Sequence, residues 1–370
     1  MMIRTHTPTR TVRLSLLAAI VAIAISGMAP RIEARQDKAS AKQKQASASP
    51  TDRLPVWPLP PETPRIRYVR SYHGLSDFKT KKAPKWKALL LGDDPSDQKP
   101  LDALVKPYGI AVSRIGRVYV TDTVARRVFV FDPEAKTLSF LGEAGTAKLT
   151  KPIGVAVDAD DHVFVADATV NRVFGYGLDG HLFMAIGREG ELDNPSGLAI
   201  DRVRNLLYVA DAKKHHVLCY STKDGSSVRT IGKRGGAPGE FNFPTNLFVD
   251  GRGQLYVTDT MNFRIQVFDT EGAFVSEFGT QGDTPGSLNR PKGVGVDSEG
   301  HVYVVDSSFN NFQAFDANGQ LLLFVGSVGR APGEFFLPAG LYVDDHDQIY
   351  VADQGNARVQ VFEYLKAGVR

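Results

Sequence analysis

Cysteine is nearly absent from this chain of 370 residues, and its scarcity limits the chemistry available. The single Cys219 excludes an intrachain disulfide and a cluster of thiolate metal ligands. Because Cys219 lies in the apolar run Val217–Tyr220, we expect a buried and unreactive thiol. An excess of one charge is absent as well, since 44 basic and 41 acidic residues leave a formal net charge of +3. Nucleic acid and anionic membranes are therefore not expected as general partners.

Apolar runs long enough to cross a membrane are also missing. The apolar stretch from Leu14 to about Ala29 is shorter than the ~20 residues that a helical span needs. Arginines precede it, and a basic segment followed by a short apolar one is typical of a signal peptide. We therefore expect residues 1–34 to direct export to the periplasm or the extracellular space. An uncleaved N-terminal anchor, which would tether the chain to the membrane, is the alternative.

Residues 35–64 differ in composition from the rest of the chain. Gln36–Ser49 is rich in Lys, Gln, Ala and Ser, which predicts a flexible, solvated linker. Leu54–Pro61 is rich in proline and predicts a stiff polyproline segment. We expect Trp57 to dock on the folded body, with docking on a partner as the alternative. The folded domain is predicted to occupy residues 65–370.

One sequence pattern occurs six times along this folded domain. Each copy has a Pro-x-Gly-like triplet that leads into a short apolar run, and then a second apolar run that ends in aspartate. Successive aspartates are 44 to 48 residues apart, and a fixed period in this range is typical of repeat folds. The repeated residues are Pro107, Pro152, Pro195, Pro244, Pro291 and Pro338, with Asp122, Asp167, Asp211, Asp259, Asp306 and Asp353.

Each copy predicts four short strands, which we name a to d in chain order. Period-2 alternation marks the strands, and tight turns such as Asp250–Gly253 separate them. Six four-stranded sheets in series predict an all-β, six-bladed β-propeller. The sixth copy lacks a strand d, because only eight residues follow Phe362. Ile66–Gly74 has the form of a strand d, so we expect this N-terminal strand to complete the last blade and close the ring.

The repeated pattern resembles that of the NHL repeat family of six-bladed propellers. Thr258–Asp269 and Ala352–Phe362 are similar to the Asn-x-Arg-hydrophobic-x-Val-Phe segment of that family. The resemblance recurs in register over roughly residues 65–363, and it implies the propeller fold. It implies little about activity, because family members include ubiquitin-ligase targeting modules, RNA binders, receptor-kinase sensor domains and an amidating lyase.

The repeated aspartates and glycines are interpreted as structural. Arginine stands five residues after the aspartate in four copies, as in Asp259 and Arg264, which predicts an Asp–Arg pair that holds the b–c loop. The glycine of Pro-x-Gly is interpreted as a backbone constraint at the start of strand a. Asn246 replaces it in the fourth copy, and we expect a left-handed backbone conformation there.

The predicted lining of the central channel carries no set of metal ligands. The centres of the a strands, such as Val155–Val157 and Leu341–Val343, contain no carboxylate, histidine or amide side chain. Propeller hydrolases of the gluconolactonase type hold calcium or zinc with such groups, so this class is not favoured. A metal-dependent hydrolase or lyase with a site at the mouth of the channel is the alternative function. No cofactor or metal is predicted, and turn histidines such as His162 and His301 are expected to be solvated.

Function is expected on the loops that join strand b to strand c and strand d to the next strand a. These loops carry a mild basic charge with interspersed aromatic side chains, which suits a protein or another anionic macromolecule as partner. We predict an exported, non-enzymatic and monomeric binding propeller of the cell envelope. The insertion at residues 75–106 is a further candidate, because long loops are often functional. The candidate partner-binding residues are Tyr108, Arg126, Arg188, Lys213, His215, His216, Asn246, Phe263, Lys292 and Phe309.

Overall fold

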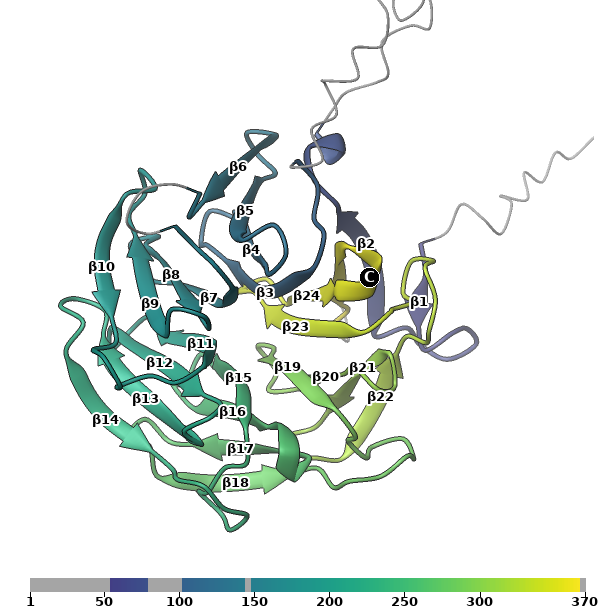
Figure 1. The fold of residues 1–370 in the computed structure, drawn as a ribbon. Coiled ribbons are helices and arrows are strands. Elements are labelled where there is room, and N and C mark those ends of the chain that lie inside the picture. Colours follow the sequence, from purple (N-terminus) through teal and green to yellow (C-terminus); the bar gives the residue numbers. More distant parts are fainter. Residues whose placement is uncertain (1–53, 79–101, 144–147, 367–370) are drawn as a thin grey trace, which may run out of the picture. The chain divides into compact units, whose positions relative to one another are not determined.

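The computed structural model describes residues 54–78, 102–143 and 148–366, and they form a ring of antiparallel sheets (Figure 1). Five of the six sheets have four strands, and the sixth has five. The ring confirms the predicted six-bladed propeller. The predictions for residues 1–34, for the linker before residue 54 and for residues 79–101 of the insertion lie outside the described residues.

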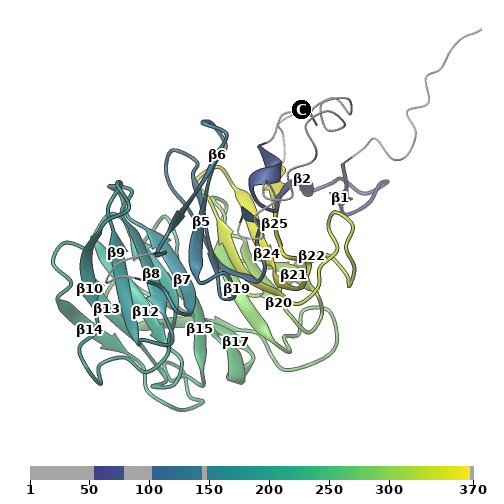
Figure 2. The same ribbon diagram turned by 45° about the horizontal axis from the view of Figure 1, so that its top comes forward.

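Each blade runs from strand a at the channel to strand d at the outer edge, as the a-to-d order predicts. Figure 2 shows this order obliquely, with β10 and β14 outside and β7 and β15 further in. The strands of the first three blades are β3 (Pro107–Val112), β4 (Val118–Asp122), β5 (Arg127–Asp132), β6 (Thr137–Leu141), β7 (Pro152–Val157), β8 (Val163–Asp167), β9 (Arg172–Tyr176), β10 (Leu182–Ile186), β11 (Pro195–Asp201), β12 (Leu206–Asp211), β13 (His216–Ser221) and β14 (Ser227–Ile231). Those of the last three are β15 (Pro244–Val249), β16 (Leu255–Asp259), β17 (Arg264–Phe268), β18 (Phe274–Phe278), β19 (Pro291–Val296), β20 (Val302–Asp306), β21 (Asn311–Phe315), β22 (Leu321–Val325), β23 (Pro338–Val343), β24 (Gln348–Asp353) and β25 (Arg358–Tyr364).

The N-terminal strand closes the ring, as predicted. Strand β2 (Ile66–Tyr72) pairs antiparallel with β25 of the sixth blade and takes the place of its missing strand d. A short β1 (Val56–Trp57) adds a fifth strand beside β2. The Trp57 ring lies 5.8 Å from the ring of Phe362, so Trp57 docks on the folded body. Because β2 pairs with β25, the last sheet has no open edge beside β25.

Helix is confined to single turns in the described part of the chain. These are the 3-10 turns η2 (Leu75–Asp77), η6 (Thr260–Asn262) and η7 (Gln354–Asn356). None of the described helices is long and apolar enough to cross a membrane.

The hydrophobic core lies between neighbouring blades, where the faces of two sheets meet. Tyr119 and Val128 of the first blade, for example, belong to one buried cluster with Val155, Val163 and Phe174 of the second. Successive side chains of a strand point to opposite faces of the sheet, so each blade presents apolar side chains to the blade on either side. The scaffold of each channel mouth is therefore held by packing on both sides of every blade.

The repeated glycines allow the a strands of adjacent blades to approach one another. A Cβ atom on Gly340 would lie 2.1 Å from the carbonyl oxygen of Tyr108, and one on Gly154 would lie 2.2 Å from that of Ser196. Glycine is therefore needed because the two backbones approach closely. Neither glycine has a positive φ, so backbone conformation does not require glycine here. Asn246 also lies outside the left-handed region, so our expectation for its backbone is wrong.

Candidate functional site: the two mouths of the channel

The repeated aspartates tie together the loops of one face. Oδ2 of Asp306 accepts hydrogen bonds from the backbone N–H groups of Asn289 and Arg290, at 2.7 and 2.9 Å. Its Oδ1 accepts from the N–H groups of Ser308 and Phe309, at 2.9 and 3.3 Å. The same two pairs of bonds recur in the first two blades. One carboxylate thus joins a d–a loop to a b–c loop, which confirms its predicted structural role.

The expected Asp–Arg pair is present in only two of the described blades. Nε of Arg264 lies 2.9 Å from Asp259, and Nε of Arg358 lies 2.8 Å from Asp353. In the first blade, Arg127 pairs with Glu143 instead. Our prediction of an Asp–Arg pair is therefore confirmed in the fourth and sixth blades and wrong in the first and second, where backbone N–H groups satisfy the aspartates.

Inside these tied loops, the channel opens into a hollow of 850 Å³, which we name the basin. Strand a begins at the repeated proline, so the residues on either side of the proline stand at the mouth of the channel. These two residues are two positions apart and project to the same side of the chain. The basin residues of this kind are Lys106, Lys151, Asn194, Phe243 and Arg290 before the proline, and Tyr108, Ile153, Ser196, Thr245 and Lys292 after it.

The charge of the basin is entirely positive. Its ionised lining residues are Lys106, Lys151, Arg290 and Lys292, and no described Asp or Glu lines it. None of these four side chains forms an ion pair or a side-chain hydrogen bond with another described residue. Burial lowers the pKa of Lys292, and repulsion from Arg290 lowers it further. Burial also raises the pKa of Tyr108 to about 12, so its hydroxyl stays neutral.

Three of the predicted partner-binding residues line the basin, namely Tyr108, Phe263 and Lys292. The structure therefore brings part of the predicted set together on the predicted face. Asn246 lies deeper, on the wall of the hollow at the opposite mouth. Its Oδ1 is buried and has no hydrogen-bond partner among the described residues.

The adjacent histidines shape the wall of the basin without lining it. His215 is buried, and its Nδ1 accepts a hydrogen bond from the backbone N–H of Phe243 at 3.2 Å. The two rings lie 4.6 Å apart, so His215 holds Phe243 at the edge of the basin. His216 has a buried Nε2 with no described partner, and burial lowers its pKa.

The other predicted residues lie outside the basin lining. Arg126 and Arg188 are exposed, and Phe309 is half-buried in a b–c loop. Nζ of Lys213 lies 3.3 Å from a carboxylate oxygen of Asp193, so its charge already has a partner.

Sequence reasoning missed three basin cations, namely Lys106, Lys151 and Arg290. A signal was present, because each stands immediately before a repeated proline. The side chain at this position reaches the mouth because strand a starts there in every blade.

Arg202 of the third blade reaches across the opposite mouth, which we name the a–b mouth after its turns. Its Nη2 donates to the carbonyl oxygen of Val112 at 2.9 Å, and its Nε donates to that of Val157 at 3.2 Å. Nη2 also donates to the hydroxyl of Tyr342 at 3.2 Å, and Nη1 pairs with Asp345 at 3.3 Å. One guanidinium therefore joins the third blade to the first, second and sixth. The hollow at this mouth measures 510 Å³.

Most carboxylates around the a–b mouth also have cationic partners, whereas Asp344 accepts its described hydrogen bonds from uncharged groups only. Their ion pairs are Asp201 with Arg204 at 2.8 Å, Asp250 with Arg252 at 3.0 Å, Asp345 with Arg202 at 3.3 Å and Asp347 with Lys366 at 2.9 Å. The two mouths therefore differ in kind. Charges at the a–b mouth have both signs and are mostly paired, whereas those of the basin have one sign and are unpaired within the described residues.

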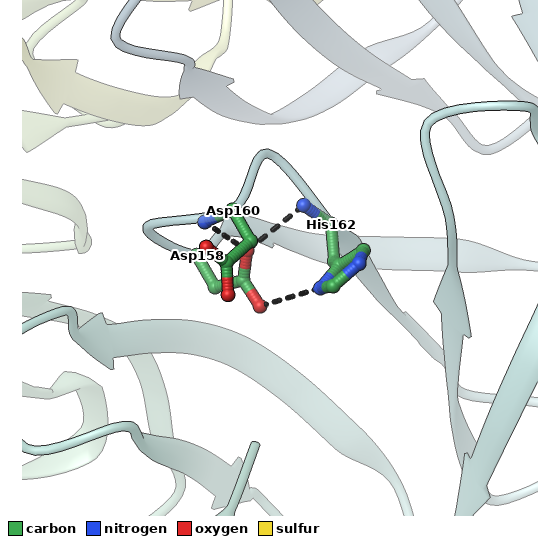
Figure 3. A group of neighbouring side chains, drawn as sticks. All are labelled: Asp158, Asp160 and His162. Carbon is green, nitrogen blue, oxygen red and sulfur yellow. Dashed lines mark hydrogen bonds and ion pairs between the residues drawn. The ribbon is translucent and has the colours of Figure 1, made fainter. Parts of the chain in front are cut away.

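One group of three potential metal ligands occurs in the described part of the chain, in an a–b turn (Figure 3). Oδ1 of Asp158 accepts the N–H groups of Asp160 and His162, and Oδ2 lies 3.0 Å from Nδ1 of His162. Asp297 makes the same contact with His301 at 2.9 Å. Because the Asp–His contact recurs in two a–b turns, it indicates a structural feature of these turns rather than a metal centre. Both histidines are partly buried partners of aspartate, so the expectation that they are simply solvated is wrong.

Comparison with known families decides the nature of the repeat. The NHL repeat matches residues 149–176, 192–220 and 337–362, and a family described as a 6-bladed beta-propeller matches residues 251–322. This chain is a six-bladed propeller with NHL repeats. The resemblance inferred from the repeated residues is thereby confirmed.

Relatives of this NHL-repeat propeller share only part of their length with it. NHL repeat-containing protein 2 of Bos taurus is 36% identical over 95 residues, which cover 23% of this chain and 13% of that protein. The E3 ubiquitin-protein ligase TRIM32 of Homo sapiens is 42% identical over 45 residues, or 12% of this chain and 7% of the ligase. A gluconolactonase structure from Xanthomonas campestris has a TM-score of 0.56 at 18% identity and covers 71% of this chain and 87% of the gluconolactonase. That structure shows the fold alone.

Proposed function

We propose that this NHL-repeat propeller is an exported, non-enzymatic binding protein of the cell envelope. In this proposal it acts as a monomer, and it holds a protein partner against the face formed by its b–c and d–a loops. We name this surface the binding face. Protein binding is a common role of NHL-repeat propellers. The closed ring supports the proposal, because a rigid scaffold that presents loops is well suited to recognition.

Exposed apolar side chains on the binding face are the observation that carries this proposal. Met261 and Val124 in b–c loops are 50% and 55% exposed, and Phe243 in a d–a loop is 41% exposed. Further exposed apolar residues of these loops are Val105, Val170, Val328, Phe336 and Leu337. Exposed apolar surface around a hollow is typical of a protein interaction site.

Capture of envelope proteins on the purified full chain tests this function. A Met261→Ser, Val124→Ser double variant removes apolar surface from the binding face. Leu178→Ser, at a c–d turn on the opposite face, is the matched control, since Leu178 is 66% exposed. We expect a partner retained by the wild type and by Leu178→Ser to be lost from the double variant. A partner that stays bound to the double variant, or that is lost from Leu178→Ser, contradicts the proposal.

A metal-dependent hydrolase or lyase at the mouth of the channel is the competing function, and metal content separates the two. Elemental analysis of the purified chain, with and without a chelator, is the measurement. Stoichiometric zinc or calcium whose loss follows substitution of carboxylates at the a–b mouth, such as Asp201→Asn, would favour the enzyme. Most described carboxylates there are engaged in ion pairs, and this supports the binding function instead.

A further inference from the structure

The cations of the basin come from separate blades and meet in one hollow. Lys106 belongs to the first blade, Lys151 to the second, and Arg290 and Lys292 to the fifth. Each stands beside a repeated proline, where the start of strand a fixes its position. The tied loops keep these backbones in place, since Asp306 holds the N–H of Arg290 at 2.9 Å. The convergence is therefore built into the rigid part of the fold.

These cations differ from three arginines whose contacts hold the ring together. Arg264 and Arg358 contact aspartates at 2.9 and 2.8 Å, and Arg202 contacts two carbonyl oxygens, a hydroxyl and a carboxylate. The four basin cations line one hollow that no described Asp or Glu lines. Lys292 is partly buried and is repelled by Arg290, and a bound anion would relieve that repulsion. The basin is thus complementary to negative charge supplied from outside.

The surroundings of the cations favour a peptide over a free inorganic anion. The basin measures 850 Å³, which lies within the range of about 300–1,000 Å³ typical of ligand pockets. Phe243, Met261 and Phe263 line it together with neutral hydrogen-bonding side chains such as Asn194 and Thr123. An inorganic ion would leave the apolar lining unused, whereas an acidic peptide with apolar neighbours would contact both parts.

The arrangement is less suited to nucleic acid. A bound strand carries a phosphate on every nucleotide and needs a cationic track with stacking rings along it. Here the unpaired cations meet in one hollow, and the ring of Phe243 already packs against His215. Binding of single-stranded RNA is therefore retained only as an outcome that the test can detect.

We propose that the basin binds carboxylate groups of an acidic protein segment whose neighbouring residues are apolar. The carboxylates lie among Lys106, Lys151, Arg290 and Lys292, and the apolar neighbours contact the exposed side chains around the hollow. This inference rests on the proposed function, because it names the chemistry of the partner segment that the binding face holds.

Selection from a phage-displayed library of random peptides on the purified full chain tests this inference. Enriched peptides are synthesised with a dye and titrated by fluorescence polarisation. The charge variant is Arg290→Gln with Lys292→Gln, and the matched control is Arg188→Gln, an exposed arginine of the same face outside the basin lining. Thermal melting confirms that each variant is folded. Inorganic phosphate and oligo-uridine RNA serve as competing probes.

We expect enriched peptides to carry Asp or Glu beside apolar residues. Their affinity should fall by about tenfold or more in the charge variant and change less than about twofold in Arg188→Gln. Enrichment of peptides without acidic residues, or of no peptide, overturns the inference. Equal affinity for the charge variant, or tighter basin-dependent binding of oligo-uridine or phosphate, overturns it as well.

The two proposals fail in distinguishable ways. In one outcome, selected peptides fail to bind the Met261→Ser, Val124→Ser variant and still bind the charge variant normally. That result agrees with the proposed binding face and contradicts only the inference about carboxylates. Peptides that respond to neither variant remove both proposals.

Discussion

The two mouths of the channel are built from the same six blades, yet they treat charge in opposite ways. At the a–b mouth, Arg202 bridges four blades, and most of the surrounding aspartates have cationic partners. In the basin, Lys106, Lys151, Arg290 and Lys292 have no described counter-charge. The ionic groups of the a–b mouth therefore contact one another and hold the ring together, whereas those of the basin are open to solvent and ligands. The difference indicates a structural role for the charges of the first mouth, and it underlies our proposal that the second mouth binds a partner.

The contrast also separates two kinds of carboxylate. The repeated aspartates are fully buried and accept several hydrogen bonds each, from four backbone groups in Asp306 and mainly from side chains in Asp353. The side chain of Asp345 at the a–b mouth is 70% exposed and makes one ion pair. Burial and the number of bonded groups, rather than charge, decide how much each contributes to stability.

The largest expected effect is the loss of a repeated aspartate beneath the basin. Asp306→Ala removes the acceptor of four backbone N–H groups, so we expect the free energy of unfolding to fall by about 3 kcal/mol. Asp345→Ala should lower it by less than about 1 kcal/mol, because an exposed ion pair contributes little. Urea unfolding measures both. Equal losses in the two variants would mean that the buried aspartates do not hold the loops.

The next effect concerns the arginine that crosses the a–b mouth. Arg202→Met leaves the carbonyl groups of Val112 and Val157 without this donor, and we expect a loss of about 2 kcal/mol. Arg114→Met is the control, since Arg114 lines the same hollow with its side chain exposed, and it should change stability by less than about 0.5 kcal/mol. If Arg202→Met is as stable as the control, the a–b mouth is not held by its ionic contacts.

A basin cation should behave in the opposite sense. Lys292→Met removes a partly buried ammonium group that Arg290 repels, so we expect the free energy of unfolding to rise by up to about 1 kcal/mol. Binding of selected acidic peptides should weaken in the same variant. Calorimetry and urea unfolding give the stability. A clear destabilisation would show that Lys292 has a stabilising partner and that the basin resembles the a–b mouth.

The smallest effect is a pH dependence that belongs to Lys292. Its pKa in the folded chain lies below the ordinary value of 10.5, so between these two pKa values the unfolded chain binds more protons than the folded one. The stability cost of Lys292 is complete below the folded pKa and disappears as pH rises toward 10.5. The wild type should therefore gain stability relative to Lys292→Met over this interval, in urea titrations at several pH values. A constant difference would contradict the lowered pKa.

The fold was within reach of the sequence because its information is local and repeated. Six copies of one pattern predict the blades, and the shortage of residues after Phe362 predicts that Ile66–Gly74 closes the ring. Of the candidate binding residues, Tyr108, Phe263 and Lys292 lie in the basin lining, and their role in binding stays a prediction. The remaining basin cations were missed, because their role depends on where strand a begins at the channel mouth. Arg202 was missed since its partners lie in three other blades, a relation that no local pattern contains.

Zero-length carbodiimide cross-linking between the full chain and its captured envelope partner tests the central claim most directly. The reagent joins a lysine amine to a carboxylate that already contacts it, and mass spectrometry locates the linked residues. The account predicts links from Lys106, Lys151 and Lys292 to acidic residues of the partner. It also predicts that these links are lost from the Arg290→Gln, Lys292→Gln variant, in which the a–b mouth is unchanged. Links that avoid these lysines and join the partner's amines to Asp250 or Asp345 at the a–b mouth would contradict it.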